Sequence, residues 1–163
     1  MLSTKKICQS NNKKRKESTM NALDLFLTAP NQETFKAIQG NAWILTRVFQ
    51  KNEELAKNWF KFGEWFKICQ DLNSFDDDEK TKIRAFLKSS VSSFDEAIKY
   101  YYSLGYDDRM AWQQDFINHA KTVENLRFVL HQVNQKYRKE IIEKMRNVAA
   151  SDEEKKIAYS YAI

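Results

Sequence analysis

Few residues in this chain have types that could do chemistry. The two histidines, His119 and His131, have no Asp or Glu three residues before them, so the Glu-x-x-His ligand pair of di-iron helical bundles is missing. Two cysteines, Cys8 and Cys69, form neither a Cys-x-x-Cys pair nor a disulfide framework. The acidic run at 76–79 lacks the glycine and distal glutamate of a calcium loop, and is expected to be a capped helix start. We therefore expect no metal, no cofactor and no enzymatic activity.

One further pair could act on RNA. Arg127 and His131 lie one helical turn apart. Their arrangement faintly resembles the Arg…His motif of the helical HEPN ribonucleases, which has a longer spacing. The sequence favours an exposed pair on the polar face of a helix instead.

The densest local signal is the segment 59–66, which has five aromatic residues in eight positions. On one continuous helix these rings would cover more than half of the circumference, which is typical of a central helix or of one shared with a partner. Gly63 would leave a notch for another backbone or a flat ligand. A core helix is the first interpretation. A partner-binding surface formed by Trp59, Phe60, Gly63 and Trp65 is the second.

A second aromatic cluster is Tyr100, Tyr101 and Tyr102. Three consecutive helical residues cannot share one face, so at least one ring is expected at the surface. Base stacking would also need a basic groove, and the neighbouring residues are acidic. We expect a mixture of core and surface tyrosines, with a secondary role in partner binding.

The charge of the chain is unevenly distributed. Six of its 27 basic residues and one of its 22 acidic residues precede Met20, so the 144 residues from Met20 onward carry 21 of each sign. Residues 1–19 lack periodicity and are predicted to be a disordered basic tail. Its patch, Lys13, Lys14, Arg15 and Lys16, would suit nuclear localisation or weak, salt-sensitive nucleic-acid binding. Alternatively, translation starts at Met20 and the tail is not made.

The rest of the sequence predicts an all-α fold. Glycine and proline are scarce, with three and one respectively, and β-hairpins depend on such turn residues. We predict an irregular antiparallel bundle of about six to seven helices. Its long members would be 42–72, either continuous or broken near Asn52, and 122–149. Residues 20–163 would form a single domain, and no internal repeat is convincing.

Local signals predict where several helices begin and end. Asn31 suits the start of a second short helix, and Asp76 the start of a later one. Ser93 and Ser151 each precede a glutamate by three residues, as in a capping box. Gly105 is placed as a glycine that ends a helix.

These features favour a small non-enzymatic binding or regulatory protein that acts by protein–protein interaction through an aromatic helix surface. Self-association through an apolar seam at 123–148 is another open interpretation. One alternative is a nucleic-acid-associated protein held by its tail, and a second is an amphipathic helical coat on an apolar or membrane surface. No apolar run is long enough to span a membrane. The expected location is the cytoplasm, or the nucleus if the tail acts as a targeting signal.

Overall fold

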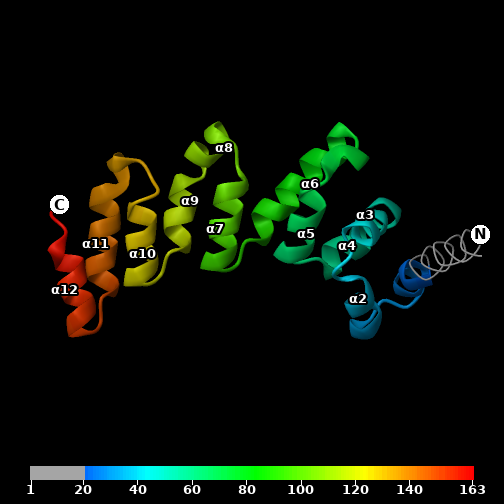
Figure 1. The fold of residues 1–163 in the computed structure, drawn as a ribbon, viewed down its shortest axis with the longest axis horizontal. Coiled ribbons are helices and arrows are strands. Elements are labelled where there is room, and N and C mark those ends of the chain that lie inside the picture. The colour runs from blue at the N-terminus through cyan, green and yellow to red at the C-terminus, as the bar shows by residue number, and fades with distance from the viewer. Residues whose placement is uncertain (1–20) are drawn as a thin grey trace, which may run out of the picture. The chain divides into compact units, whose positions relative to one another are not determined.

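The computed structural model describes residues 21–163, and in this range the chain is all-helical, with twelve helices and no strand (Figure 1). A first helix covers residues 21–28. The next five are α2 Gln32–Ile38, α3 Ala42–Lys51, α4 Glu53–Trp59, α5 Phe62–Cys69 and α6 Asp77–Ser90. The last six are α7 Phe94–Ser103, α8 Tyr106–Ala111, α9 Gln113–His119, α10 Val123–Leu130, α11 Arg138–Val148 and α12 Asp152–Ser160. The predicted tail and its Lys13–Lys16 patch lie outside the described residues.

The all-α prediction is confirmed, but the predicted number of helices is too low. The segment 42–72 contains three helices, because the chain breaks at Asn52 and again at Phe60 and Lys61. The Asn52 side chain accepts a hydrogen bond from the main-chain N–H of Leu55 and so starts a new helix. Phe60 and Lys61 have extended backbones, so α5 begins afresh at Phe62.

The second long helix is also wrong. The segment 122–149 folds into α10, a short 3₁₀ turn over Gln135–Tyr137 and α11. Asn134 is extended, and its side chain accepts a hydrogen bond from the main-chain N–H of Lys136, which starts the turn. The apolar spacing continues through this break, which is why it predicted one helix. The predicted seam at 123–148 is therefore divided between two helices that pack on each other.

The predicted helix starts are mostly confirmed. Asn31 forms a capping box with Thr34, and Ser151 forms one with Glu154. Asp76 accepts a hydrogen bond from the main-chain N–H of Glu79. Gly105 differs from the prediction because its φ of −68° is ordinary for any residue and it precedes α8.

The chain divides into two compact units, Met1–Ser90 and Val91–Ile163, here called unit 1 and unit 2. The core of unit 1 is dominated by aromatic rings. Phe26, Phe35 and Trp59 meet with ring centroids 5.3–5.6 Å apart, and Phe49 meets Trp65 edge to face at 5.9 Å. The prediction that residues 20–163 form one domain stays a prediction.

Unit 2 is built from a repeated helix pair, contrary to the expectation of no repeat. Its helices α7, α10 and α12 are capped by Ser93, Thr122 and Ser151, which are 29 residues apart (93 to 122 and 122 to 151). Within unit 2, α7 packs on α9, α10 on α11, and α11 on α12. Such stacking of similar helix pairs is the arrangement of helical repeat proteins.

The core of unit 2 follows the same period. Seven residues after each cap stand Tyr100, Val129 and Ala158, all buried. In the second helices, Phe116 and Met145 are 29 residues apart, as are Trp112 and Ile141 and also Gln113 and Ile142, and all six are buried. Each repeat therefore contributes side chains to the core from the same positions.

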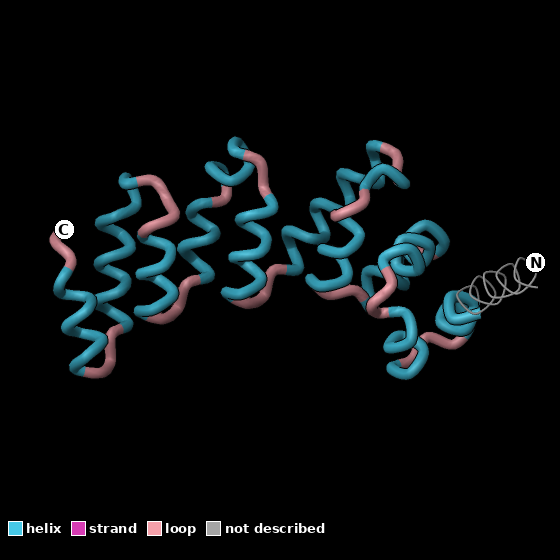
Figure 2. Tube along the Cα trace, viewed as in Figure 1, coloured by secondary structure: helices cyan, strands magenta, loops and turns pink. Residues whose placement is uncertain are grey.

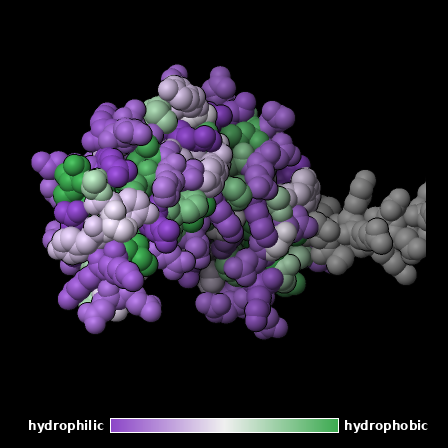
Figure 3. Space-filling view, turned by 60° about the vertical axis from the view of Figure 1, so that its left-hand side comes forward, coloured by the Kyte–Doolittle hydropathy of each residue, from purple (hydrophilic) through white to green (hydrophobic). Residues whose placement is uncertain are grey.

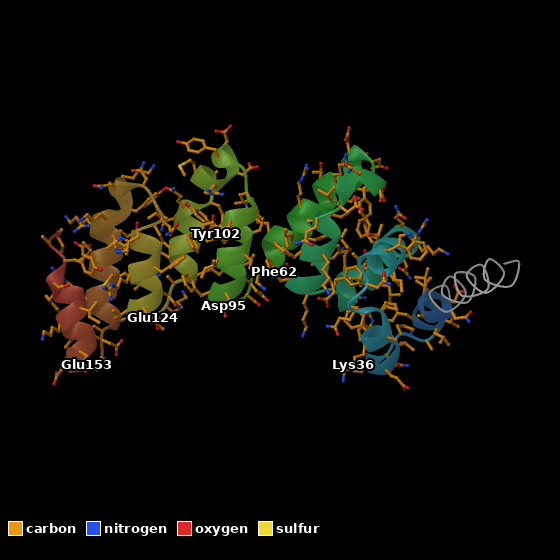
Figure 4. All side chains as sticks on the ribbon, viewed as in Figure 1. Lys36, Phe62, Asp95, Tyr102, Glu124 and Glu153 are labelled. Atoms are coloured by element: carbon orange, nitrogen blue, oxygen red, sulfur yellow. The ribbon has the colours of Figure 1, made fainter. Side chains whose placement is uncertain are left out.

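The pictures agree with this register. Asp95, Glu124 and Glu153, close to the starts of α7, α10 and α12, lie at one edge of unit 2 (Figure 4). The first helices of the repeats therefore run in the same direction, and the loops of unit 2 lie at the ends of its helices (Figure 2).

The face shown in Figure 3 is mostly hydrophilic, with apolar residues between hydrophilic ones. Among the described residues, no helix is both long and apolar enough to cross a membrane.

Candidate functional site

The aromatic residues at 59–66 belong to two helices rather than one, so the predicted continuous arc of rings does not exist. Phe60 and Trp65 are buried, with 6% and 3% of their surface exposed. Their ring centroids lie 5.1 Å apart, and Phe60 also lies 6.3 Å from Phe35. Both side chains therefore belong to the core of unit 1.

Gly63 does not form the predicted notch. A methyl group added at its Cα would meet no atom within 4 Å, so neither a backbone nor a side chain approaches it closely. Gly63 is an exposed residue in the first turn of α5.

Trp59 is half-buried, and it is the predicted residue that reaches a concave surface. This surface is a pocket of about 670 Å³ between α2 and the junction of α4 with α5, here called the groove. Its lining residues are Gln32, Glu33, Phe35, Lys36, Gln39, Asn58, Trp59, Lys61 and Glu64. Lys36 is marked on α2 in Figure 4.

The groove combines an aromatic wall with charged groups of both signs. Phe35 and Trp59 form that wall, with ring centroids 5.3 Å apart. Two lysines and two glutamates also line the groove, so their formal charges balance. This arrangement favours a ligand with an apolar anchor and no large net charge.

Glu64 is the most perturbed carboxyl group of the groove. It is buried, with 6% of its surface exposed. Burial raises its pKa, while hydrogen bonds from the main-chain N–H groups of Glu64 itself and of Lys61, together with the charges of Lys67 and Lys61, act in the opposite direction. A carboxyl group with a raised pKa in a concave surface is a common mark of a binding site.

The rim of the groove carries amide side chains. Within the described residues, those of Gln32, Gln39 and Asn58 form no hydrogen bond with another protein group. An amide can donate and accept at once, as a peptide bond requires of its partners. These groups are therefore available to a ligand's main chain.

The predicted tyrosines Tyr100, Tyr101 and Tyr102 lie in unit 2 and do not line the groove. Tyr100 and Tyr101 are buried, whereas Tyr102 is 48% exposed. The hydroxyl groups of Tyr101 and Tyr102 donate hydrogen bonds to the main-chain carbonyl and the side chain of Gln132. The structure thus gives these two tyrosines a role in holding neighbouring repeats together.

The other residues singled out by type are dispersed. Arg127 donates a hydrogen bond to the Tyr161 hydroxyl, while His131 ends α10 at the surface. No group of three or more potential metal ligands occurs among the described residues.

Sequence reasoning found Trp59 but missed its neighbours in the groove. Glu64 had a local signal, because it stands three residues after Lys61, the residue that precedes α5. Phe35 and Lys36 had none, since only the packing of α2 brings them to Trp59.

No protein-family model matches the chain, and no match was found among curated proteins or solved structures. The assignment of a function must therefore rest on the chain's own geometry.

Proposed function

We propose that this is a non-enzymatic helical binding protein that captures a peptide segment of a partner protein in the groove between α2 and the α4–α5 junction. The observation that carries the proposal is the position of Trp59. Its ring forms a wall of the groove together with Phe35, while amide side chains without protein partners line the rim. Aromatic anchors within concave surfaces account for much of the affinity of protein interfaces.

The groove suits a peptide better than a highly charged ligand. An apolar peptide side chain would pack against Trp59 and Phe35, and the peptide's main chain would bond to Gln39 or Asn58. The lysines and glutamates of the lining balance each other, so they favour neither a polyanion nor a polycation.

The proposal is tested by selecting binders from a random peptide library on the full-length protein. The selected peptides are then titrated against variants. Trp59→Ala is expected to weaken their binding by about 2 kcal/mol or more, as at an interface hot spot. Trp43→Ala is the matched control, because Trp43 is 49% exposed in unit 1 and does not line the groove. It is expected to bind the peptides as the wild type does.

The position of the bound peptide gives a second measurement. A photo-crosslinking residue at Gln39 should capture the peptide, whereas one at Gln50, outside the groove lining, should not. Equal losses of binding in the two tryptophan variants, or crosslinking from Gln50 alone, would contradict the proposal.

The tail-based alternative predicts a different result. Binding to nucleic acid that disappears when residues 1–19 are removed, and that Trp59→Ala leaves unchanged, would favour a nucleic-acid-associated protein. Peptide binding by the form that begins at Met20 would instead show that the helical part of the chain is sufficient.

A further inference from the structure

A cluster of three arginines lies in unit 2, away from the groove lining. Arg127 Nε donates a hydrogen bond to Tyr161 Oη at 3.1 Å. Arg146 Nη2 donates to the main-chain carbonyl of Tyr161 at 2.9 Å. Arg138 Nη2 donates to the carbonyl of Ala162 at 3.1 Å. Three guanidinium groups from α10 and α11 thus converge on two consecutive residues, and we call them the arginine cluster.

The cluster has no carboxylate to balance it. The two ion pairs found among the described residues join Lys57 to Glu54 and Lys82 to Glu53, so neither involves an arginine. A guanidinium has five N–H donors, and each arginine of the cluster uses one of them on residues 161–162. Three close positive charges with unused donors form an environment that favours an anion.

One of those donors is buried. Arg146 Nε is inaccessible to solvent and has no hydrogen-bond partner. Leaving a buried donor unsatisfied typically costs about 1–3 kcal/mol, so such a group requires an explanation. A bound oxyanion that draws the guanidinium toward it would remove this cost.

The repeat register shows that the cluster is a local addition. Positions 29 residues before Arg127 and Arg146 hold Ile98 and Ile117. The equivalent junction in the preceding repeat is joined by hydroxyl groups of two tyrosines, which bond to Gln132. Holding a repeat in place therefore does not require arginines at these positions.

The third arginine does have an equivalent, and the comparison is informative. Arg109, 29 residues before Arg138, donates hydrogen bonds to the main-chain carbonyls of Tyr101, Tyr102 and Leu104. Its guanidinium is therefore largely satisfied by the end of α7. Arg138 bonds to a single carbonyl and lies over the Tyr161 ring at 6.0 Å, so more of its donors remain unused.

We propose that Arg127, Arg138 and Arg146 form an oxyanion-binding site that accepts a phosphate or carboxylate group beside Tyr161. Both groups match the planar, multiply donating guanidinium. The geometry points to an anionic ligand group or an anionic side chain of a partner. The site is independent of the proposed peptide groove.

The test uses the full-length protein with inorganic phosphate, pyrophosphate and malonate, each titrated at constant ionic strength against chloride. The arginine Nε–H resonances report on binding. We expect a saturable shift of the Arg146 signal. A stronger response to phosphate and pyrophosphate than to malonate would identify a phosphate site, and the reverse order a carboxylate site.

Variants separate a specific site from general charge. Arg127→Gln is expected to weaken binding by about tenfold, as for the loss of one charge-assisted hydrogen bond. Tyr161→Phe removes the same Arg127 hydrogen bond but keeps all three guanidinium groups, so it should retain binding. Arg47→Gln should also retain binding, because Arg47 is an exposed arginine that lies over Trp43 in unit 1.

Two results would overturn the proposal. One is the absence of a saturable shift with all three anions, which would mean that solvent satisfies the guanidinium groups. The other is an equal loss of binding in Tyr161→Phe or Arg47→Gln, which would mean that the cluster has no special affinity for anions.

Discussion

The phenolic hydroxyl of Tyr101 donates a hydrogen bond to the main-chain carbonyl of Gln132, 3.1 Å away, and so joins one repeat of unit 2 to the next. One period later, the carbonyl of Tyr161 accepts a hydrogen bond from Arg146. The end of a repeat's first helix is therefore held by a side chain of the preceding repeat at both junctions. Contacts of this kind between neighbours supply much of the stability of repeat proteins.

Tyr101→Phe is expected to lower the free energy of unfolding by about 1 kcal/mol, because it removes a hydrogen bond from a buried tyrosine. Tyr102→Phe is the control, since that hydroxyl bonds to the Gln132 side chain at an exposed position and its loss should cost less than about 0.5 kcal/mol. Urea unfolding measures both values. A larger loss in the control would contradict a structural role for the buried bond.

The three caps of the repeat should contribute similarly. Replacing Ser93, Thr122 or Ser151 with Ala removes a side-chain acceptor from a helix start, so each change is expected to cost about 1 kcal/mol. Ser89→Ala is the control, because Ser89 is exposed near the end of α6 and caps no helix start. Thermal unfolding followed by circular dichroism would show equal midpoints for all four variants if the caps were unimportant.

Trp65 provides a test of the core assignment. Trp65→Ala is expected to cost about 3–5 kcal/mol, as for other large-to-small changes in a protein core. Trp43→Ala should change stability by less than about 0.5 kcal/mol because half of its side chain is exposed. Denaturant unfolding of the two variants decides the matter. Similar small effects would return Trp65 to the surface, as the partner-binding interpretation of the sequence supposed.

Gly63→Ala tests the idea of a notch directly. Since a methyl group at this position meets open space, alanine should raise the free energy of unfolding by about 0.5–1 kcal/mol through its better helix propensity. A notch that receives another backbone would give the opposite sign. Peptide binding in the groove should be unaffected, because Gly63 is not part of its lining.

Capping chemistry is local, so the sequence predicted several helix starts correctly. Asn31, Ser93 and Ser151 accept hydrogen bonds from residues three positions later, and that spacing can be recognised in the sequence itself. The breaks within the two long segments were missed because their apolar spacing continues. Leu130 and Val133 are three residues apart, as in a helix, although the chain turns between them.

The repeat and the groove could not be predicted in the same way. Equivalent core positions hold residues of different kinds, such as Gln113 and Ile142, so the period is not visible as sequence similarity. The groove depends on α2 packing beside the α4–α5 junction. Trp59 was found by its residue type, but its position beside Phe35 is a consequence of tertiary packing.

Glu64 makes stability depend on pH. Its folded pKa is raised above the ordinary value of 4.5, mainly by burial. Between the two pKa values the folded state binds more protons than the unfolded state, so stability falls as pH rises through this window. At neutral pH the ionised carboxylate is therefore a net cost, although it still accepts hydrogen bonds at the start of α5.

Glu64→Gln removes this charge and keeps an oxygen that can accept the main-chain hydrogen bonds. The variant is expected to be more stable than the wild type at pH 7, and the difference should shrink as pH falls through the folded pKa. Urea unfolding at pH 7 and pH 4 measures this change. Glu33→Gln, at an exposed glutamate of the same groove, is the control. A Glu64→Gln variant that is less stable at pH 7, by an amount that does not vary with pH, would show that the hydrogen bonds outweigh burial.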